Sequence, residues 1–558
     1  MLLNIAKNLY GYKKGISVIM KKNFLWLAIL AALTLVLGAC GFGGDKSSDD
    51  KSGEKTLNLS IASEPPSLHP QLATDTQSGS ILNGVFEGLT RVDDQGKVEN
   101  AMAEDVKVSD DKLTYTFTLR DAKWSNGDQV VAGDFEYAWK WALEPKNAAQ
   151  YSYIFYAIKG AEAYNTGKGK AEDVGVKALD DKTLEVTLNN PTPYFLELTA
   201  FYSYMPVDQK VVEKNDKWFA EAGDNYVTNG PYTLKEWKHN DSVTLAKSDT
   251  YWDKENVDVD KINIAMVESS TTADRMFQSG DLDFLGAPFQ VVALDKIDSY
   301  KKDKSLNIED TAAIYVYKFN TKDDVMKNKN IRKALTLGMD RQGLIDNVTK
   351  GEQKPANGVV PKSIDGWDSQ KTFLKDNDMA AAKEALQAGM KELGIKDASD
   401  IKVKLSINTD EAHAAIAQYI QEGWNKNLGI NVTIDNSEWQ VYLDKVDNGD
   451  FQVARMGWSG DYNDATTFLD QYTTASNGNN QTGWESKEYQ TLMAKAQKET
   501  NDETRLGYLQ KAEQVLMADY PVAPIYDYTT LYVVKDGITG MEPDVLGNIN
   551  LKNVKISK

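Results

Sequence analysis

The sequence predicts a mixed α/β fold with more than one domain. Short strands and helices alternate along the whole chain, and strand-like segments in the first half give way to a strand–helix–strand unit in the second. About 500 residues follow the N-terminal apolar segment, which is enough for two or three domains of ordinary size. The hydrophobic content of 41% can supply a substantial core.

Alternation of apolar and polar residues predicts the strands of the first half. Leu57, Leu59 and Ile61 alternate with polar residues and predict the first strand. The same pattern predicts a strand over residues 115–119, a hairpin over 176–188 that turns at Asp180-Asp181, and two strands over 232–247 around Asn240-Asp241.

Helix signals are stronger in the second half. Asp378 caps a helix predicted over 379–393, which Gly394 ends, and Gly429 ends a second helix predicted over 411–428. Strands predicted at 403–407 and 430–434 flank that second helix, so we expect a parallel pair joined by a crossover helix. The remaining predictions are a turn at Asn448-Gly449, a strand over 451–458 and amphipathic helices over 487–498 and 502–517.

The N-terminus has the pattern of an export signal. Four lysines at 13, 14, 21 and 22 precede an apolar run over 24–37, which is too short for an ordinary transmembrane helix. The run ends in Leu37-Gly38-Ala39-Cys40, which resembles the bacterial lipobox, in which the cysteine is acylated after cleavage. We therefore predict a lipoprotein signal peptide over 1–39, and a lipidated Cys40 with a flexible tether over 40–55. An uncleaved anchor helix is the alternative, and both Met1 and Met20 remain open as the start.

Composition excludes several classes of partner and site. Cys40 is the only cysteine, so the chain cannot form an intramolecular disulfide or a cysteine-based metal site. Residues 1–39 hold five lysines and no acid, so their removal takes the formal net charge from −19 to −24. That charge argues against nucleic acid or anionic lipid as a partner of the globular part. The 12 Trp and 27 Tyr suit a binding cleft, although most must serve in the core or on the surface.

A series of short motifs in a fixed order carries a family resemblance. The motifs are Ser67-Leu68-His69-Pro70, Phe86-Glu87-Gly88-Leu89, Ala103-Glu104-Asp105, the run from Tyr115 to Arg120, Trp124-Ser125-Asn126-Gly127-Asp128, Asp134-Phe135, Asn229-Gly230-Pro231-Tyr232, Tyr251-Trp252, Ile331-Arg332-Lys333-Ala334, the run from Arg455 to Tyr462, and the run from Pro521 to Tyr526. Together they resemble the peptide-binding family of transporter solute receptors, the oligopeptide- and dipeptide-binding proteins. The resemblance extends from about residue 56 to the C-terminus.

The resemblance implies a two-lobed, periplasmic-binding-protein-like fold with a hinge. Lobe I would take residues 56–86, 205–312 and 523–558, an inserted domain 87–204, and lobe II 313–522. The implied function is that of an extracellular receptor, held to the outer face of the membrane of a Gram-positive-type cell by Cys40. It would bind oligopeptides between the lobes, as a monomer without a cofactor, and deliver them to the permease of an ABC transporter.

The resemblance also implies the peptide-binding residues. Asp461 follows the strand predicted at 451–458 and matches the family aspartate that binds the peptide α-ammonium group. Taken alone, the residue better fits an acidic loop residue that caps the next helix, and the motif around it favours the ligand role. Aromatic residues that match positions at the peptide are Trp439, Trp458 and Tyr151. His413 and Arg455 match positions that meet the carboxylate end of certain peptides.

Four positions depart from the family pattern. Val446 stands where relatives have a second carboxylate-contacting arginine, and Thr74 replaces an acidic residue, although Asp75 adjoins it. Gly286-Ala287 stands where relatives have polar side chains. These departures leave the preferred peptide length and the recognition of the peptide C-terminus open.

Other classes of function fit the sequence less well. The chain has three histidines, none in the His-Glu-x-x-His spacing, and it has no Gly-x-Ser-x-Gly motif and no catalytic cysteine, so an enzyme is not expected. A receptor of the same fold for a signalling peptide, a nickel chelate, haem or a sugar is the main alternative. A surface adhesin or chaperone is the third.

Overall fold

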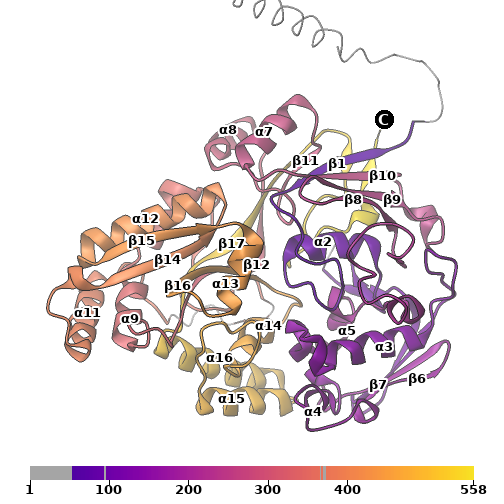
Figure 1. Cartoon of the computed structure of the whole chain (residues 1–558), viewed down its shortest axis with the longest axis horizontal. Helices are drawn as coiled ribbons and strands as arrows, with labels where there is room; N and C mark the ends of the chain where they lie inside the picture. The colour runs from indigo at the N-terminus through magenta and orange to yellow at the C-terminus, as the bar shows by residue number, and fades with distance from the viewer. Residues whose placement is uncertain (1–52, 94–95, 365, 368–372, 558) are drawn as a thin grey trace, which may run out of the picture. The chain divides into compact units, whose positions relative to one another are not determined.

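The computed structural model describes residues 53–93, 96–364, 366–367 and 373–557 (Figure 1). The chain divides into two units, residues 1–53 and residues 54–558, and the fold below is that of the second unit. The predicted signal peptide at 1–39, Cys40 and most of the tether at 40–55 lie outside the described residues. In the part of the chain that is described, no helix is both long and apolar enough to cross a membrane.

The first sheet contains the predicted N-terminal strand. Its four strands lie in the order β1 (Thr56–Ile61), β10 (Lys261–Met266), β9 (Ser242–Lys247) and β8 (Tyr232–Lys238), which confirms the two strands predicted over 232–247. β1 and β10 are parallel, and the other pairs are antiparallel. Helix α2 (Thr76–Val85) begins after Asp75, whose side chain accepts hydrogen bonds from the backbone of Gln77 and Ser78, and it contacts β8.

The second four-stranded sheet is antiparallel throughout. Its order is β4 (Ala103–Val108), β5 (Thr114–Leu119), β7 (Thr183–Thr187) and β6 (Val176–Asp180), which confirms the predicted hairpin. Along β5 every second residue is buried, because helix α3 (Ala132–Leu143) packs on this sheet. Short elements complete this region: β2 (Thr90–Val92), β3 (Val98–Asn100), η2 (Gln150–Ala157), α4 (Ala161–Asn165), α5 (Phe195–Leu198) and α6 (Gln209–Val212).

The third sheet is larger and mixed. Its strands lie in the order β11 (Phe284–Gly286), β17 (Val522–Val534), β12 (Asn307–Phe319), β16 (Val453–Ser459), β14 (Lys402–Asn408) and β15 (Asn431–Ser437), and β13 (Lys354–Pro355) also pairs with β17. Helix α12 (Glu411–Leu428) joins β14 to β15, which are parallel, so the predicted crossover unit is confirmed. Gly429 ends α12 with a φ of 73°, a left-handed conformation that suits glycine.

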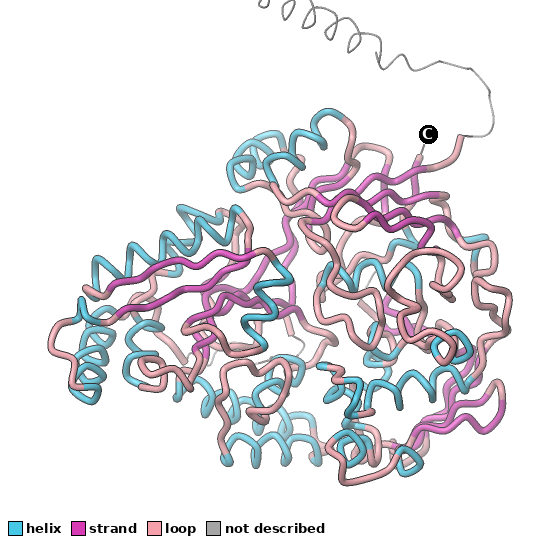
Figure 2. Tube along the Cα trace, in the orientation of Figure 1, coloured by secondary structure: helices cyan, strands magenta, loops and turns pink. Residues whose placement is uncertain are grey.

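Helices flank the strands of the large sheet, and α12 packs against β14 and β15 (Figure 2). The predicted helices over 379–393 and 487–498 are α11 (Met379–Leu393) and α15 (Lys487–Lys498), and the one over 502–517 is α16 (Asp502–Asp519). The other helices are α7 (Ser270–Ser279), α8 (Ile297–Asp303), α9 (Lys329–Leu337), α10 (Arg341–Leu344), α13 (Trp439–Asp447) and α14 (Thr466–Leu469). A short pair, β18 (Ile538–Thr539) and β19 (Lys555–Ile556), lies near the C-terminus.

Two large apolar cores are connected by the long strands of the third sheet, with Tyr532 of β17 in the first core and the second half of β12 in the second. Nearly all buried residues of the first core fall between Leu57 and Phe289, and those of the second fall between Ala312 and Leu546. The pairing of β12 with β17 shifts register between Asp310 and Ile314, close to where the second core begins. The ring of Trp458 packs against both cores. The domain boundaries given above stay a prediction.

Gly230, in the motif Asn229-Gly230-Pro231-Tyr232, packs so closely against the backbone of Val85 that no side chain would fit at this position. Its N–H donates to the carbonyl of Val85 at 2.9 Å, and a Cβ at this position would lie 2.5 Å from the carbonyl carbon of Val85. We expect Gly230→Ala to lower the free energy of unfolding by about 1–3 kcal/mol through this steric conflict, measured by urea titration. Gly507→Ala is the matched control, because nothing lies within 4 Å of its Cβ in α16, and it should raise stability by about 0.5–1 kcal/mol. Equal effects of the two changes would contradict this account.

Candidate functional site

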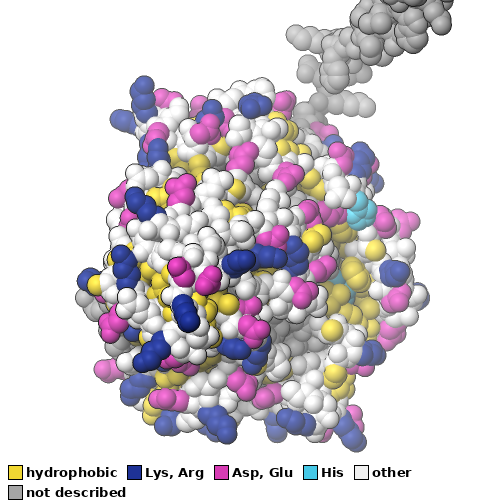
Figure 3. All heavy atoms as spheres, turned by 60° about the vertical axis from the view of Figure 1, so that its left-hand side comes forward, with side chains coloured by type: hydrophobic (Ala, Val, Ile, Leu, Met, Phe, Trp, Pro, Cys, Tyr) yellow, Lys and Arg dark blue, Asp and Glu magenta, His cyan; other side chains and the backbone are white. Residues whose placement is uncertain are grey.

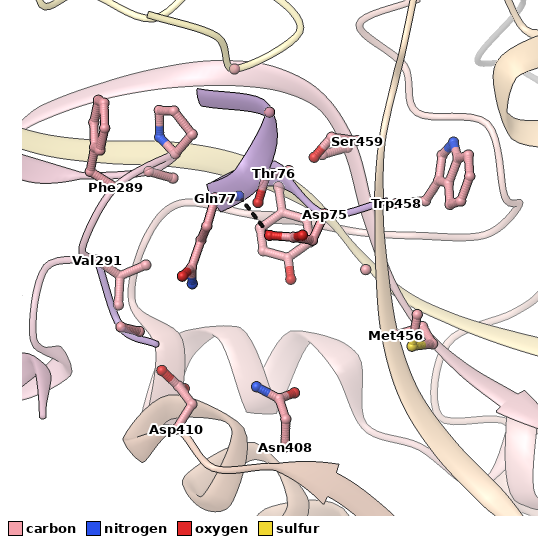
Figure 4. A pocket seen from close by; sticks show the side chains of 18 of the residues that line it. Asp75, Thr76, Gln77, Phe289, Val291, Asn408, Asp410, Met456, Trp458 and Ser459 are labelled. Carbon is pink, nitrogen blue, oxygen red and sulfur yellow. Dashed lines mark hydrogen bonds between the residues drawn. The ribbon is translucent and has the colours of Figure 1, made fainter. Parts of the chain in front are cut away.

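A cavity of about 720 Å³ lies between the two cores. Its wall takes Tyr151, Tyr202 and Phe289 from the first core, and Ile416 and Tyr526 from the second. Figure 4 shows side chains from both sides pointing into one space, with Gln77 and Val291 opposite Asn408 and Asp410. The size and the mixed lining are typical of a ligand site.

One edge of β16 is open along the cavity. β16 pairs with β12 from Val453 to Ser459, but on its other edge it pairs with β14 only at Val453 and Ala454. From Arg455 to Asp461 every residue lines the cavity, and no described strand covers this edge. An open strand edge presents backbone N–H and C=O groups, which can pair with an extended chain of any sequence.

Asp461 lies at the end of this edge, in the cavity wall. Its carboxylate accepts hydrogen bonds from the hydroxyl of Tyr151 at 3.3 Å and from Oγ1 of Thr467 at 3.2 Å. Burial raises the pKa of Asp461 to about 7, and the hydrogen bonds from Thr467 and Tyr151 oppose this rise. Among the described residues, no Lys or Arg forms an ion pair with Asp461. The site therefore holds a poorly solvated carboxylate that a ligand cation would satisfy.

Aromatic rings flank Asp461. Trp458 stacks on Tyr151, with ring centroids 6.1 Å apart, although η2 and β16 are distant in sequence. Tyr151 also contacts the rings of Phe201 and Tyr202. Flat aromatic walls of this kind tolerate side chains of many shapes.

Trp439 lines another part of the cavity, at the start of α13. Its ring stacks on Tyr442 with centroids 6.2 Å apart. The indole Nε1 is buried and has no hydrogen-bond partner among the described protein groups. A ligand carbonyl or a water molecule could accept this hydrogen bond.

Arg455 begins the open edge of β16 and is 8% exposed. Its guanidinium donates to the hydroxyl of Tyr528 at 2.8 Å and to Oδ1 of Asn408 at 3.4 Å, and it lies 4.8 Å from the ring centre of Tyr315. Its Nε–H is buried without a partner in the described structure. No described carboxylate lies within ion-pair distance of Arg455, so a buried cation faces the cavity with its charge only partly compensated.

His413 lies beside Arg455 and is uncharged at neutral pH. Burial, followed by the positive charge of Arg455, lowers the pKa of His413 to about 3, against a smaller opposing effect of Asp410. Its Nδ1 lies 3.4 Å from the hydroxyl of Tyr315. His413 can therefore offer a hydrogen bond to a ligand but not a positive charge.

The six predicted binding residues thus all line the same cavity: Tyr151, His413, Trp439, Arg455, Trp458 and Asp461. The prediction did not include further acidic residues in the wall: Glu64, Asp75, Glu197, Glu268, Asp410, Glu438 and Asp447. Asp75, Asp410 and Glu438 cap helices α2, α12 and α13. An acidic residue just before a predicted helix was the sequence feature that could have pointed to them. On the face shown in Figure 3, basic and acidic side chains are interspersed. Among the described residues that line the cavity, by contrast, Arg455 is the only Lys or Arg, so the wall is mainly acidic.

Two of the residues that depart from the family pattern, Val446 and Gly286, are closely packed. Val446 is fully buried in a small core with Tyr442, Phe451 and Ala454, and it does not line the cavity. Gly286 has no room for a side chain, because a Cβ at this position would collide with Cβ of Tyr532. Within the described part of the chain, no three His, Cys, Asp or Glu side chains are grouped so that they could hold a metal ion.

Comparisons with known proteins agree with this architecture. The family model for the bacterial extracellular solute-binding proteins, family 5 Middle, matches residues 97–480. The oligopeptide-binding protein OppA of Bacillus subtilis (strain 168) is 50% identical over 541 residues, which cover 96% of this chain and 99% of the relative. The structure of Listeria monocytogenes OppA bound to peptide has 36% identity and a TM-score of 0.83, and the match covers 91% of this chain and 100% of that chain.

Two structures of one further protein bear on the arrangement of the lobes. The murein tripeptide binding protein MppA of Escherichia coli has 29% identity and a TM-score of 0.86, over 91% of this chain and 99% of that chain. A structure described as the unliganded open form of MppA has the same identity, and the match covers 90% of this chain and 98% of that chain. Its TM-score, however, is only 0.62. The present arrangement is therefore unlike that open form. On these matches and on its two-core, α/β architecture, the chain belongs to the bacterial extracellular solute-binding proteins of family 5.

Proposed function

We propose that this protein is an extracellular receptor that binds oligopeptides in its cavity and delivers them to the permease of an ABC importer. The observation that carries the proposal is the combination of an open strand edge with opposite charges at its two ends, Asp461 and Arg455. An extended peptide has the complementary form, because its backbone can pair with the edge and its termini carry opposite charges. OppA of Bacillus subtilis is an oligopeptide-binding protein, MppA of Escherichia coli is a murein tripeptide binding protein, and OppA of Listeria monocytogenes was solved with peptide bound.

Each cavity residue receives a role in this proposal. Asp461 binds the α-ammonium group, while Arg455 and neutral His413 meet the peptide carboxylate. Trp439, Trp458 and Tyr151 surround the side chains, where stacking and water-filled space accept many sequences. The receptor is selective for a free N-terminus and a range of lengths rather than for a sequence, and it catalyses no reaction on the peptide.

The location and the domains complete the proposal. The lipidated Cys40 would hold the protein, as a monomer, at the outer face of the membrane, and residues 41–55 would act as a tether. Residues 56–86, 205–312 and 523–558 would form lobe I, 87–204 an inserted domain, and 313–522 lobe II, closing on the ligand about a hinge. Metabolic labelling with a fatty acid, lost in a Cys40→Ala variant, tests the anchor.

Native mass spectrometry of the protein purified from cells tests the ligand class. We expect co-purified peptides with free N-termini, whose masses also give the preferred lengths. A different bound solute, or peptides that are all blocked at the N-terminus, would contradict the proposal.

Peptide affinity should depend on pH with a maximum between about pH 7 and 8. Because the pKa of Asp461 is raised to about 7, binding at lower pH requires loss of a proton, and affinity should fall by up to about tenfold per pH unit. Above about pH 8 the peptide amine, with an ordinary pKa of about 7.7–8.0, loses its own proton and affinity should fall again. Calorimetry from pH 5 to 9 measures this profile, and Asp461→Asn should abolish its acidic limb. A flat profile below pH 7 in the unaltered protein would contradict the role of Asp461.

A further inference from the structure

The two sides of the cavity are held together at one end by a contact that we call the Glu411 clasp. It consists of Glu411, the first residue of α12, and of Ser269, Ser270 and Thr271 at the start of α7. The carboxylate accepts hydrogen bonds from the hydroxyls of Ser269 and Ser270 at 2.8 Å each, and from that of Thr271 at 2.9 Å. About 140 residues separate the partners, so the contact exists only while the two sides of the cavity lie together.

The clasp lies just outside the cavity wall. Glu411 does not line the cavity, but its neighbours Asp410 and Ala412 do, and so does Glu268 beside Ser269. His413, two residues further along α12, lies beside Arg455 at the end of the cavity that suits a carboxylate. The clasp therefore crosses the rim of the cavity at the end where the C-terminus of a bound peptide would lie.

The opposite end of the cavity is closed differently. There, Tyr462 stacks on Tyr194 with ring centroids 4.5 Å apart, and Tyr462 is only 3% exposed. The N–H of Asn463 donates to Glu197 at 2.6 Å across the same boundary. Separating this pair would expose the buried ring of Tyr462 to water, which opposes opening at this end.

The contacts at the carboxylate end are instead polar and open to solvent. The side chain of Glu411 is exposed, and two further ion pairs between residues 298–301 and 350–352, Lys301–Glu352 and Lys350–Asp298, each join a partly exposed lysine to an exposed acid. Exposed contacts of this kind contribute little each, since water competes for both partners. This end is therefore the one that can open without exposing a core.

We propose that the Glu411 clasp sets the upper limit of peptide length. Peptides that end inside the cavity bind with the clasp closed and are retained by it. Longer peptides must extend across the rim between α7 and α12, which breaks the clasp and forfeits its hydrogen bonds. The clasp is a specificity determinant that touches no part of a short ligand. This inference rests on the proposed binding of peptides.

The test compares affinities across a series of alanine-rich peptides of three to nine residues, by calorimetry and by dissociation rate. Glu411→Ala should make the shortest peptides dissociate about three- to tenfold faster, the size of effect expected for exposed charge-assisted contacts. It should leave the affinity of the longest peptides unchanged or raise it, so that the ratio of long- to short-peptide affinity rises by a similar factor. The double variant Ser270→Ala, Thr271→Val should change this affinity ratio in the same way. Adding Glu411→Ala to the double variant should change the ratio little further, because all three changes remove the same contact.

Glu422→Ala is the matched control, because Glu422 is an exposed glutamate of the same helix that does not line the cavity. It should leave the length series unchanged. A uniform fall in affinity at all lengths, or no change in the ratio, would overturn the clasp as a length determinant. If the unaltered protein binds no peptide of any length, the proposed function fails instead, so the two failures are distinguishable.

Discussion

Replacing Asp461 with alanine should weaken the binding of a short peptide by about 2–5 kcal/mol, the usual cost of removing one partner of a buried charge pair. That range corresponds to about a 30- to 5,000-fold increase in Kd. The reason is geometric as well as electrostatic, since Asp461 already has two hydroxyl partners and lacks only a cation. Calorimetry with one free peptide and its N-acetylated form measures the effect. The acetylated form should bind the unaltered protein weakly and should lose little further affinity in the variant.

The isosteric change Asp461→Asn separates charge from shape. It can keep the contacts with Thr467 and Tyr151 but carries no charge, so it should show most of the same loss of affinity. The folded-state pKa of Asp461, about 7, lies above the ordinary value of 3.8, so the ionised carboxylate reduces stability as pH rises through this range. At pH 8 the Asn variant should therefore unfold at an equal or higher temperature than the unaltered protein. Equal loss of affinity for free and acetylated peptides would contradict the assignment of Asp461 to the ammonium group.

Much of the second half of the fold could be predicted because its signals are local. Helices α11 and α12 begin after capping aspartates and end at glycines, and both predicted ranges match the structure residue for residue. The parallel pairing of β14 with β15 followed from the helix between them. These features depend on residues a few positions apart, which the sequence displays directly.

The long strands that join the two cores could not be predicted in the same way. The second half of β12 is buried on both faces, so it lacks the alternation that marks a half-buried strand. β17 contains Pro524, which argues against a central strand, yet β17 pairs on both sides. A register shift beside Pro524 accommodates the missing N–H, because Tyr315 pairs with Tyr526 while the next residue of β12 pairs with Pro524. This pairing joins segments that are far apart in the sequence, so no local pattern reveals it.

The same limit applies to the site. Asp461, Trp458 and Arg455 are visible in the sequence within one motif. Their proposed role in binding, however, depends on the edge of β16 that stays unpaired after Ala454. The sequence could not show that β14 leaves β16 after Ala454, nor that Tyr151 lies 3.3 Å from Asp461 across 310 positions of chain. The Glu411 clasp was invisible for the same reason, since an exposed glutamate at a helix start has an ordinary local role.

Arg455 should be as important as Asp461, but only for peptides whose carboxylate reaches it. Arg455→Met removes the charge while keeping a long side chain against Tyr315, and we expect a loss of about 2–5 kcal/mol for such peptides. C-terminal amides of the same peptides should bind the unaltered protein less tightly and should lose little more in the variant. Calorimetry of acid and amide forms with both proteins completes a double-mutant cycle, which isolates the contact.

The stability of the Arg455→Met variant gives an independent test. Arg455 is buried, makes hydrogen bonds only to neutral groups, and leaves its Nε–H unsatisfied in the described structure. Replacing a poorly compensated buried cation with an apolar side chain is often neutral or stabilising. The ligand-free variant should therefore have an unchanged or higher urea midpoint, even as it loses affinity for peptide acids. A marked fall in stability would instead make Arg455 a structural residue of β16. Loss of peptide binding without loss of stability would identify a charge kept for the ligand.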